Sequence, residues 1–328
     1  MRVDLASVEQ VFAWLDNLKF PIAAATVEPS RAVGRALLID FRSPHGLPQH
    51  NIASIDGMAV VAAHTLGAGP YNPIKVQAHP VRIGMAVPQD CDAVLPVDAV
   101  QHGMALEAVA SGEHVMAAGS QLRRGECLFS AWHVLRPQDV AVLSELGIEG
   151  LTVRAGLLVC GGVHAAFSEL ALALLGRDLS QWDTSGDLVL TSSPLPGDDW
   201  EIGAVALRPG GACRFGYRAG LPAICLPQDA LGFTIAYNLF VSRLLRRMAG
   251  LPMGHLEIEA RLAGKLVSSI GHTDIALVTL NDGVATPLAW AETGGAAGLA
   301  RADGFVIVPA MREGMPPGAL VSVRLLAT

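Results

Sequence analysis

An aspartate in a tight turn is the best-placed candidate for a chemically active residue. Asp56 stands in the run Ser54-Ile55-Asp56-Gly57 and is followed by the apolar residues 58–61. A carboxylate held in such a turn can accept a proton or orient a water molecule. The same Asp-Gly step is also a common turn leading into a β-strand, so a purely structural role for Asp56 stays open.

Three predicted strands end in small or polar residues that can together line a pocket. These ends are Gly161-Gly162, Ser192-Ser193 and Pro227-Gln228-Asp229. In open α/β sheets, ligands bind beyond the carboxyl ends of the parallel strands. We therefore predict a ligand pocket at this edge, although ordinary strand-to-helix turns use the same residue types.

The residues that most often bind metals are dispersed along the chain. The five cysteines and ten histidines form no pair with the spacing of a metal site. Three of the cysteines lie within apolar, strand-like runs, so we interpret most of them as buried thiols in a reducing compartment. The sequence thus predicts no metal site made by protein ligands.

The composition excludes several classes of protein. With 328 residues, 51% hydrophobic and 16% charged, the chain is expected to form two to four folded domains. Its net charge of -7 and its lack of long basic runs argue against nucleic acid as a partner. We found neither an apolar run of about 18 residues, the length of a membrane span, nor a signal peptide. These features predict a cytoplasmic protein.

The elements that would position Asp56 belong to a β-rich stretch from residue 52 to about 118. A helix capped by Ser7 and Gln10 precedes it, followed by a short predicted helix over 31–40 and a crossing loop over 43–51. A later helix is expected between Pro137 and Gly147, because proline favours the start of a helix and glycine its end.

Residues 151–250 alternate strand and helix patterns, which predicts a parallel sheet. The helices are expected over 165–175, ending at Gly176, and over 229–249, ending at Gly250. The remaining residues, 251–328, show short strand-like runs separated by Gly and Pro turns. That pattern is typical of a small β-barrel or sandwich.

Six short motifs follow one another in a fixed order along the chain. They are Val33–Leu37, Pro48–Val60, Val87–Val94, Leu143–Ile148, Arg208–Gly210 with Phe215-Gly216, and Leu299–Gly304. Through these motifs the chain resembles, over nearly its whole length, the molybdopterin molybdenumtransferase family, which includes MoeA-like proteins and the E domain of gephyrin.

The resemblance implies an α/β plus β fold in a multi-domain, MoeA-like architecture. The expected domains are a helical or linker domain (1–43 and 119–152), an inserted β-rich domain (44–118), a trimmed MogA-like parallel α/β domain (153–250) and a C-terminal β-barrel domain (251–328). It also implies an elongated homodimer with a pterin site in a cleft between the α/β domain and the partner's β-rich domain.

The activity implied by the resemblance is the insertion of molybdate into adenylylated molybdopterin, assisted by Mg²⁺. Asp56 matches a signature acid of the family and is the catalytic candidate. The candidates for substrate binding, taken from the matching motifs and strand ends, are Ser54, Asp98, Ser192, Ser193, Asp198, Asp199, Arg208 and Gly210.

Several residues that the family uses for chemistry are replaced in this chain. The run Gly119-Ser120-Gln121 stands where the family has Gly-Glu-Asp, and the loop 160–164 lacks the acids of Thr-Gly-Asp-Glu. Ala53 replaces the signature serine, and Ser54 comes one place later. Because Mg²⁺ prefers anionic oxygen ligands, the sequence predicts a weakened metal site.

The phosphate-binding loop of the family has also changed. Pro194 and Pro196 each remove a backbone N–H donor. Asp229 is expected to cap the following helix with its own negative charge, which would repel a phosphate. Gly211 stands where the family has a lysine. The interval 176–187 is too short for the family's additional strand and helix.

Two hypotheses therefore stay open. The chain is either a divergent enzyme of molybdenum cofactor biosynthesis, or a catalytically inactive scaffold on the same fold. Such a scaffold would bind a pterin or nucleotide, or assist the maturation of a particular molybdoenzyme. The retained acids favour the enzyme, whereas the lost acids and the altered phosphate loop favour the scaffold, because fold alone does not fix function.

Overall fold

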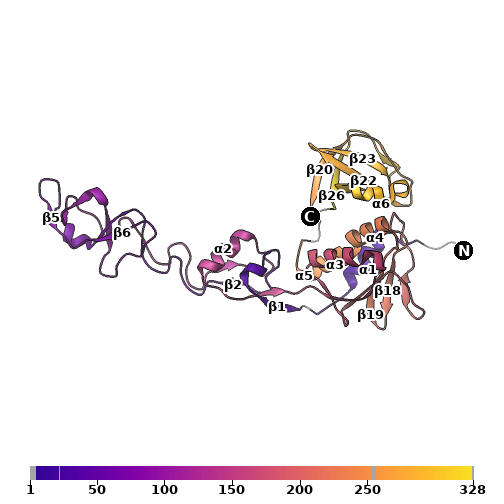
Figure 1. Cartoon of the computed structure of the whole chain (residues 1–328), viewed down its shortest axis with the longest axis horizontal. Helices are drawn as coiled ribbons and strands as arrows, with labels where there is room; N and C mark the ends of the chain where they lie inside the picture. Colours follow the sequence, from indigo (N-terminus) through magenta and orange to yellow (C-terminus); the bar gives the residue numbers. More distant parts are fainter. Residues whose placement is uncertain (1–4, 22, 253–255, 327–328) are drawn as a thin grey trace. The chain divides into compact units, whose positions relative to one another are not determined.

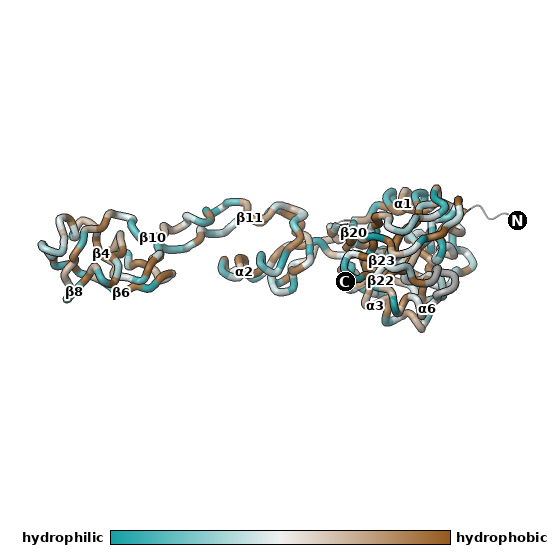
Figure 2. The backbone as a smooth tube through the Cα atoms, turned by 90° about the horizontal axis from the view of Figure 1, so that it is seen from above, coloured by the Kyte–Doolittle hydropathy of each residue, from teal (hydrophilic) through white to brown (hydrophobic). Residues whose placement is uncertain are grey.

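The computed structural model describes residues 5–21, 23–252 and 256–326 (Figure 1). The chain divides into two compact units, one made of residues 1–27, 32–38 and 152–328 and the other of 28–31 and 39–151. Hydrophobic and hydrophilic segments interleave along the backbone (Figure 2). No helix among the described residues is both long and apolar enough to span a bilayer.

The first unit begins with α1 (Val8–Asn17), whose start is fixed by the predicted capping box. Ser7 Oγ accepts a hydrogen bond from the Gln10 N–H, and the Gln10 side chain accepts one from the Ser7 N–H at 2.7 Å. The helix buries Val8, Val11 and Leu15 against the core of the unit. Two short strands, β1 (Ala24–Val27) and β12 (Leu151–Arg154), pair with each other.

A six-stranded sheet forms the centre of this unit. Its strands, in spatial order, are β14 (Gln181–Trp182), β13 (Leu158–Gly162), β15 (Leu188–Thr191), β19 (Leu221–Cys225), β18 (Arg214–Arg218) and β16 (Asp199–Ile202). The first four are parallel, as the alternation of strands and helices predicts. The last two are antiparallel additions. Ala219 (φ 49°) and Gly220 (φ 80°) form a two-residue turn with both φ positive, which directs β18 and β19 into a hairpin.

The helices of this unit follow the predicted order, with one difference at an end. After the 3₁₀ turn η4 (Ala165–Phe167), α3 (Ser168–Arg177) continues through Gly176. The predicted stop at Gly176 is therefore wrong; the helix ends at Arg177, with Asp178 as its C-cap residue.

The long helix predicted over 229–249 is confirmed. It consists of α4 (Ala230–Ala236), a π-helical turn η5 (Tyr237–Val241) and α5 (Ser242–Ala249), and it ends at Gly250, whose φ of 75° is left-handed. Such a glycine end is a common helix terminator.

A closed barrel of five strands follows in the same unit. They are β20 (Glu257–Leu262), β22 (Thr273–Asn281), β23 (Val284–Trp290), β24 (Gly304–Val308) and β26 (Leu320–Leu325). The ring closes because β24 pairs with both β26 and β22. The structure thus resolves the predicted choice between barrel and sandwich in favour of a barrel.

Smaller elements complete this part of the chain. They are β17 (Leu207–Arg208), parallel to β22, the pair β21 (Leu266–Val267) and β25 (Gly314–Met315), and α6 (Ala291–Arg301) between β23 and β24. The sequence did not predict α6, which is rich in glycine and is interrupted at Gly295 (φ 43°).

The second unit is rich in short strands, as predicted for residues 52–118. One sheet has the order β6 (His79–Val81), β4 (Gly57–Val60), β7 (Ala93–Pro96), and another has β5 (Ile74–Lys75), β9 (Met104–Ala105), β8 (Val100–Gln101). The pairs are β3 (Ile52–Ala53) with β10 (Val115–Met116) and β2 (Phe41–Arg42) with β11 (Cys127–Phe129).

The helical elements of this unit are short. They are α2 (Pro137–Glu145), which lies where it was predicted, and the 3₁₀ turns η1 (Pro29–Arg31), η2 (Ala62–Thr65) and η3 (Val97–Ala99). The helix predicted over 31–40 is wrong, because only η1 is helical there and Gly34 adopts a left-handed φ of 78°. The barrel and the β-rich stretch each contain hydrophobic clusters of their own, and the four-domain division stays our proposal.

Candidate functional site

The three strand ends proposed as a pocket lie next to one another at one edge of the sheet. The register of the parallel strands places Gly162 opposite Thr191, and Thr191 opposite Cys225. Gln228 Nε2 also donates a hydrogen bond of 2.8 Å to the carbonyl oxygen of Ser192. The predicted convergence of these ends is therefore confirmed by the sheet register.

Ser192 and Ser193 differ sharply in their surroundings. The side chain of Ser192 is buried, and its Oγ has no hydrogen-bond partner among the described residues. Ser193 is exposed, and its N–H donates to Thr191 Oγ1 at 3.1 Å. Because buried polar groups are nearly always hydrogen-bonded, the Ser192 hydroxyl is the clearest candidate at this edge for contact with a ligand.

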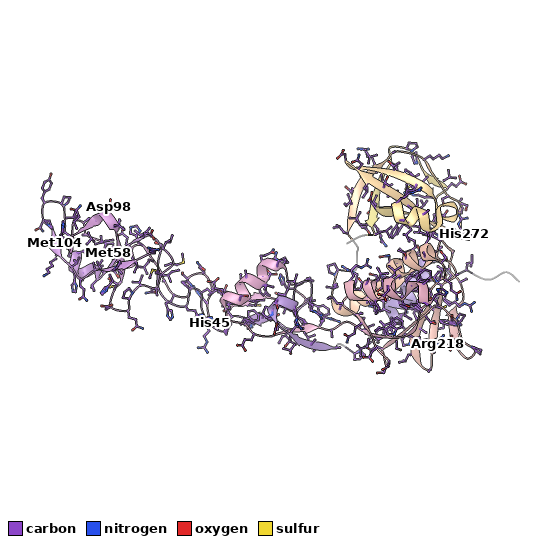
Figure 3. The ribbon with its side chains drawn as sticks, viewed as in Figure 1. His45, Met58, Asp98, Met104, Arg218 and His272 are labelled. Atoms are coloured by element: carbon purple, nitrogen blue, oxygen red, sulfur yellow. The ribbon has the colours of Figure 1, made fainter. Side chains whose placement is uncertain are left out.

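Asp198 is held by an arginine of the neighbouring hairpin. Arg218, which Figure 3 labels, donates from Nε to Oδ1 and from Nη2 to Oδ2, both at 2.7 Å. The guanidinium lowers the pKa of Asp198 below its ordinary value. Leu195 N–H donates to the same carboxylate at 2.7 Å. Asp199, the next residue, is exposed at the start of β16.

The backbone of the loop after β15 has few N–H groups left for an anion. Pro194 and Pro196 have none, and most of the other N–H groups between residues 192 and 198 are donated within the protein. The donors are Ser192 to Gly162, Ser193 to Thr191, Leu195 to Asp198, and Asp198 to Leu195. This loop therefore does not form a phosphate-binding cradle of backbone donors.

Asp229 caps α4, as the sequence predicts. Its Oδ1 accepts a hydrogen bond of 2.7 Å from the Gly232 N–H. The start of this helix is consequently occupied by a carboxylate of the chain itself, and a bound phosphate would be repelled there.

Arg208 also has a carboxylate partner within the protein. Its Nε and Nη2 donate to Oδ1 and Oδ2 of Asp274, both at 2.7 Å, and Nη2 also donates to Ser269 Oγ. This bidentate pair joins β17 to β22 of the barrel. The guanidinium proposed for substrate binding is therefore engaged in a link between β17 and the barrel.

The two glycines after Pro209 lie close to the backbone. Gly210 has a φ of 105°, which disfavours any side chain. A Cβ at Gly211 would lie 2.6 Å from the carbonyl oxygens of both Val205 and Leu207. A lysine at this position would therefore require the backbone to move. The local backbone thus does not accommodate the lysine that the family has here.

Asp56 lies in the β-rich unit and supports a neighbouring turn. Its Oδ1 accepts a hydrogen bond of 2.8 Å from the Ile83 N–H, while its side chain stays exposed. A Cβ at Gly57 would lie 2.1 Å from the Leu95 carbonyl oxygen, so the glycine of the Asp-Gly step is required by the approach of β4 to β7.

The other two candidates of this unit are less constrained. Asp98 is exposed on η3, in the same module as Met58 (Figure 3). Pro96 pairs with Gly57 in the antiparallel β4–β7 ladder. Asp56 comes just before Gly57 and Asp98 two residues after Pro96, so both aspartates lie at the same end of this ladder. Ser54 is half-buried, and its N–H donates to the His114 carbonyl oxygen at 2.9 Å.

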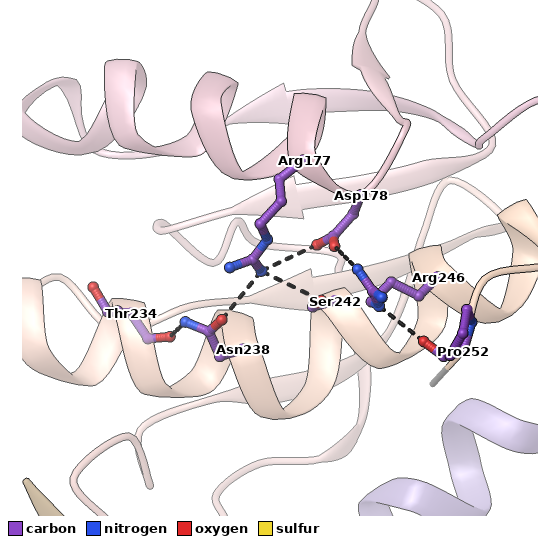
Figure 4. A network of polar contacts seen from close by, with 7 residues as sticks. All are labelled: Arg177, Asp178, Thr234, Asn238, Ser242, Arg246 and Pro252. Carbon is purple, nitrogen blue, oxygen red and sulfur yellow. Dashed lines mark hydrogen bonds and ion pairs between the residues drawn. The ribbon is translucent and has the colours of Figure 1, made fainter. Parts of the chain in front are cut away.

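A buried ionic network ties α3 to the long helix on the first unit (Figure 4). Asp178 is fully buried and contacts Arg177 and Arg246, each at 3.4 Å. Arg177 Nη2 donates to Asn238 Oδ1 at 3.1 Å and to Ser242 Oγ at 3.4 Å. These contacts satisfy buried charges within the fold, so we assign the network a structural role.

Sequence reasoning did not identify the partners of two candidate residues. Arg218 pairs with Asp198, and Asp274 pairs with Arg208. No local sequence pattern predicts either pair. The only sequence signal is the Ala219-Gly220 hairpin turn, which places Arg218 at the end of β18.

Comparisons with known proteins agree with the observed architecture. Residues 6–147 match the family described as the MoeA N-terminal region, domains I and II. A protein of Mycobacterium tuberculosis, molybdopterin molybdenumtransferase 2, is 24% identical over 306 residues, covering 69% of this chain and 76% of that protein. A putative molybdopterin biosynthesis protein of Methanocaldococcus jannaschii is 21% identical, covering 97% and 95%.

Solved structures show the same fold. A molybdopterin biosynthesis MoeA protein from Pyrococcus horikoshii superimposes with a TM-score of 0.75 at 22% identity, covering 98% of this chain and 100% of that one. Another solved molybdopterin biosynthesis MoeA structure from Pyrococcus gives a TM-score of 0.82 at 21% identity, covering 99% of this chain and 100% of that one.

Proposed function

Since the chain belongs to the MoeA-like family, whose members serve molybdenum cofactor biosynthesis, we propose that it acts there as a binding scaffold and does not itself insert molybdate. In this proposal the strand-end edge of the α/β sheet binds a pterin or a nucleotide. The bound molecule is then passed to, or held for, a molybdoenzyme or its maturation partners.

One observation carries this proposal: three of the charged groups at the candidate site are engaged by the protein itself. Asp198 is paired with Arg218, Arg208 is paired with Asp274, and Asp229 caps its own helix. A group that must bind or activate a charged substrate would have to leave such a partner, which is costly for a buried pair.

The strand-end residues also do not fit Mg²⁺. The edge offers glycines, serine hydroxyls, the Gln228 amide and the Asp229 carboxylate that caps α4, and the acid nearest to it in the loop after β15 is the arginine-bound Asp198. Mg²⁺ requires near-octahedral oxygen ligands and is usually held by free carboxylates. We therefore assign no metal-dependent step to these residues.

Neutral hydrogen-bonding groups remain at the edge and suit an uncharged heterocycle. The Ser192 hydroxyl is buried without a partner, and Gly162 has no atom within 4 Å of the position that a Cβ would take. A flat ring can approach a glycine backbone closely and form hydrogen bonds to amide and hydroxyl groups. These groups favour recognition of a pterin ring over recognition of its phosphate.

A second candidate function is a divergent molybdate-inserting enzyme, and Asp56 favours it. Its carboxylate is exposed, and only Oδ1 is engaged by the Ile83 N–H. The second oxygen can accept a proton from a ligand or position a water molecule. In this alternative molybdate is the substrate, and Asp56 acts from the β-rich domain of a homodimer.

Complementation distinguishes the two functions. The chain would be expressed in a bacterium that lacks its own molybdenum-insertion enzyme, and the activity of a molybdoenzyme would be measured. The scaffold proposal expects no restored activity, together with calorimetric binding of molybdopterin that weakens in Ser192→Val. Restored activity that disappears in Asp56→Ala would overturn the scaffold proposal in favour of the enzyme.

A further inference from the structure

Three side chains able to bind a metal meet in the β-rich unit, at residues that the proposed function does not use. One ligand atom from each of His79, Asp90 and Cys91 lies within 4.8 Å of those of the other two. His79 opens β6, whereas Asp90 and Cys91 lie in the turn before β7. The sequence did not predict this cluster, because its members come from segments separated by a turn and joined only through β4.

The register of the sheet explains why these side chains meet. His79 pairs with Ala59 on one side, and Ala59 pairs with Val94 on the other. Residues that pair across an antiparallel ladder point to the same face of the sheet. Cys91, Ala59 and Val94 share one hydrophobic cluster on that face. Since Ala59 carries only a methyl group, it leaves room above the strand for the imidazole and the thiol.

A second observation points to a ligand at this position. His79 Nε2 is buried and has no hydrogen-bond partner among the described residues. Cys91 is also buried, while Asp90 is exposed to solvent. A buried imidazole nitrogen without a partner is uncommon in native proteins. A cation coordinated through Nε2, together with the thiolate and the carboxylate, would give this nitrogen the partner that it lacks.

The ligand set selects one class of metal. Sulfur, imidazole nitrogen and carboxylate oxygen together suit Zn²⁺ and similar ions, whereas Mg²⁺ and Ca²⁺ prefer oxygen alone. With zinc–ligand distances of about 2.0–2.3 Å, bound ligand atoms lie roughly 3.3–3.8 Å apart. Because the three ligand atoms already lie within 4.8 Å of one another, a contraction of at most about 1.5 Å brings them to these separations.

Cys91 also lines a pocket of about 540 Å³ together with His50 and Gln89. The pocket gives solvent access at Cys91, so a fourth ligand from solvent can complete the coordination of a metal held by the three side chains. Three protein ligands with one open position are the arrangement of zinc sites that bind an external molecule. We propose that His79, Asp90 and Cys91 form a binding site for a single zinc-type divalent cation with one open coordination position.

The test uses the untagged full chain, freed of metal with a chelator, and the metal ion alone. Zn²⁺ is titrated by calorimetry, and Co²⁺ by its thiolate-to-metal absorption band. We expect one ion per chain. We also expect His79→Ala and Cys91→Ser to lower the affinity at least tenfold and to remove the cobalt band. Cys127→Ser, which changes an exposed cysteine of the same unit, and His102→Asn serve as controls and should bind like the parent.

Three results would overturn the proposal: no binding by the parent chain, unchanged binding in both His79→Ala and Cys91→Ser, or an equal loss in Cys127→Ser. Thermal unfolding of each metal-free variant checks that the β-rich unit still folds. Asp90→Asn changes a proposed ligand whose side chain is exposed, so it leaves the core intact. A smaller but measurable loss in Asp90→Asn supports the site even if a core variant unfolds. Because the readout is metal binding, it is independent of complementation by the proposed scaffold.

Discussion

Arg218 donates two hydrogen bonds of 2.7 Å to the carboxylate of Asp198, one from Nε and one from Nη2. The side chain of Asp198 is 3% exposed and that of Arg218 is 20% exposed. The pair therefore lies at the boundary between core and solvent. The pair removes a carboxylate from the strand-end edge and at the same time anchors the loop after β15. One arginine thus accounts both for the anchored loop and for the neutralised carboxylate of Asp198.

The pair should make the stability of the α/β unit depend on acid pH. The pKa of Asp198 is lowered in the folded state, so its contribution is present above the ordinary aspartate value of 3.8 and is lost as the pH falls through the lower folded value. Arg218→Met should lower the free energy of unfolding at pH 7 by about 3 kcal/mol. It should also reduce the loss of stability below pH 3.8.

Urea unfolding of the parent and of Arg218→Met, from neutral pH down to the acid limit of folding, measures both effects. Arg214→Met on the same strand is the matched control, since Arg214 forms no bidentate pair with a carboxylate among the described residues. Equal stability of Arg218→Met and the parent at pH 7 would contradict the structural role that we give this pair.

Restoring the family's lysine should fail at Gly211. A Cβ there would lie 2.6 Å from two carbonyl oxygens, so Gly211→Lys should destabilise the fold by about 3 kcal/mol and gain no affinity for phosphate-bearing ligands. Gly203→Lys, where a Cβ meets no atom within 4 Å, should leave stability nearly unchanged. Thermal unfolding compares the two variants. A stable Gly211→Lys with tighter ligand binding would show that only the side chain, and not the backbone, limits the site.

The glycine after Asp56 should be more sensitive than its sequence context suggests. In Gly57→Ala the new Cβ would lie 2.1 Å from the Leu95 carbonyl oxygen, which forces β4 and β7 apart. We expect a loss of at least about 3 kcal/mol in unfolding free energy. Gly69→Ala is the control in the same unit, because a Cβ there meets no atom within 4 Å. Hydrogen exchange of the β4 and β7 amides would locate the effect, and normal protection in Gly57→Ala would refute it.

Local sequence patterns predicted most of the helices and strands. They did not predict the long-range side-chain pairs at the candidate site. Ser7 and Gln10 predict the start of α1, because the two residues of a capping box are only three positions apart in the sequence. The helix expected over 31–40 failed at Gly34, whose left-handed backbone is not visible in an apolar pattern. The parallel strand ends were predicted correctly because each ends in its own turn residues.

The partners of the site residues depend on tertiary structure. Arg208 and Asp274 are 66 residues apart, and they meet only because β17 pairs with β22. His79 meets Cys91 because β4, which carries Ala59, lies between β6 and β7, and Cys91 lies in the turn before β7. No spacing rule along the chain contains that information, so the sequence could name polar candidates without showing which of them are already neutralised.

Asp56→Asn separates the structural from the catalytic role of this residue. The amide oxygen of asparagine can still accept the Ile83 N–H, which Asp56 Oδ1 accepts at 2.8 Å, but it cannot take a proton at neutral pH. The scaffold proposal expects Asp56→Asn to have the same thermal stability as the parent and the same affinity for molybdopterin. Asp56→Ala should cost about 1 kcal/mol, because the turn at Ile83 loses its acceptor. Calorimetry and thermal unfolding of the three proteins test this, with complementation as the third readout. If the parent restores molybdoenzyme activity and Asp56→Asn folds normally but does not, Asp56 is a catalytic acid or base.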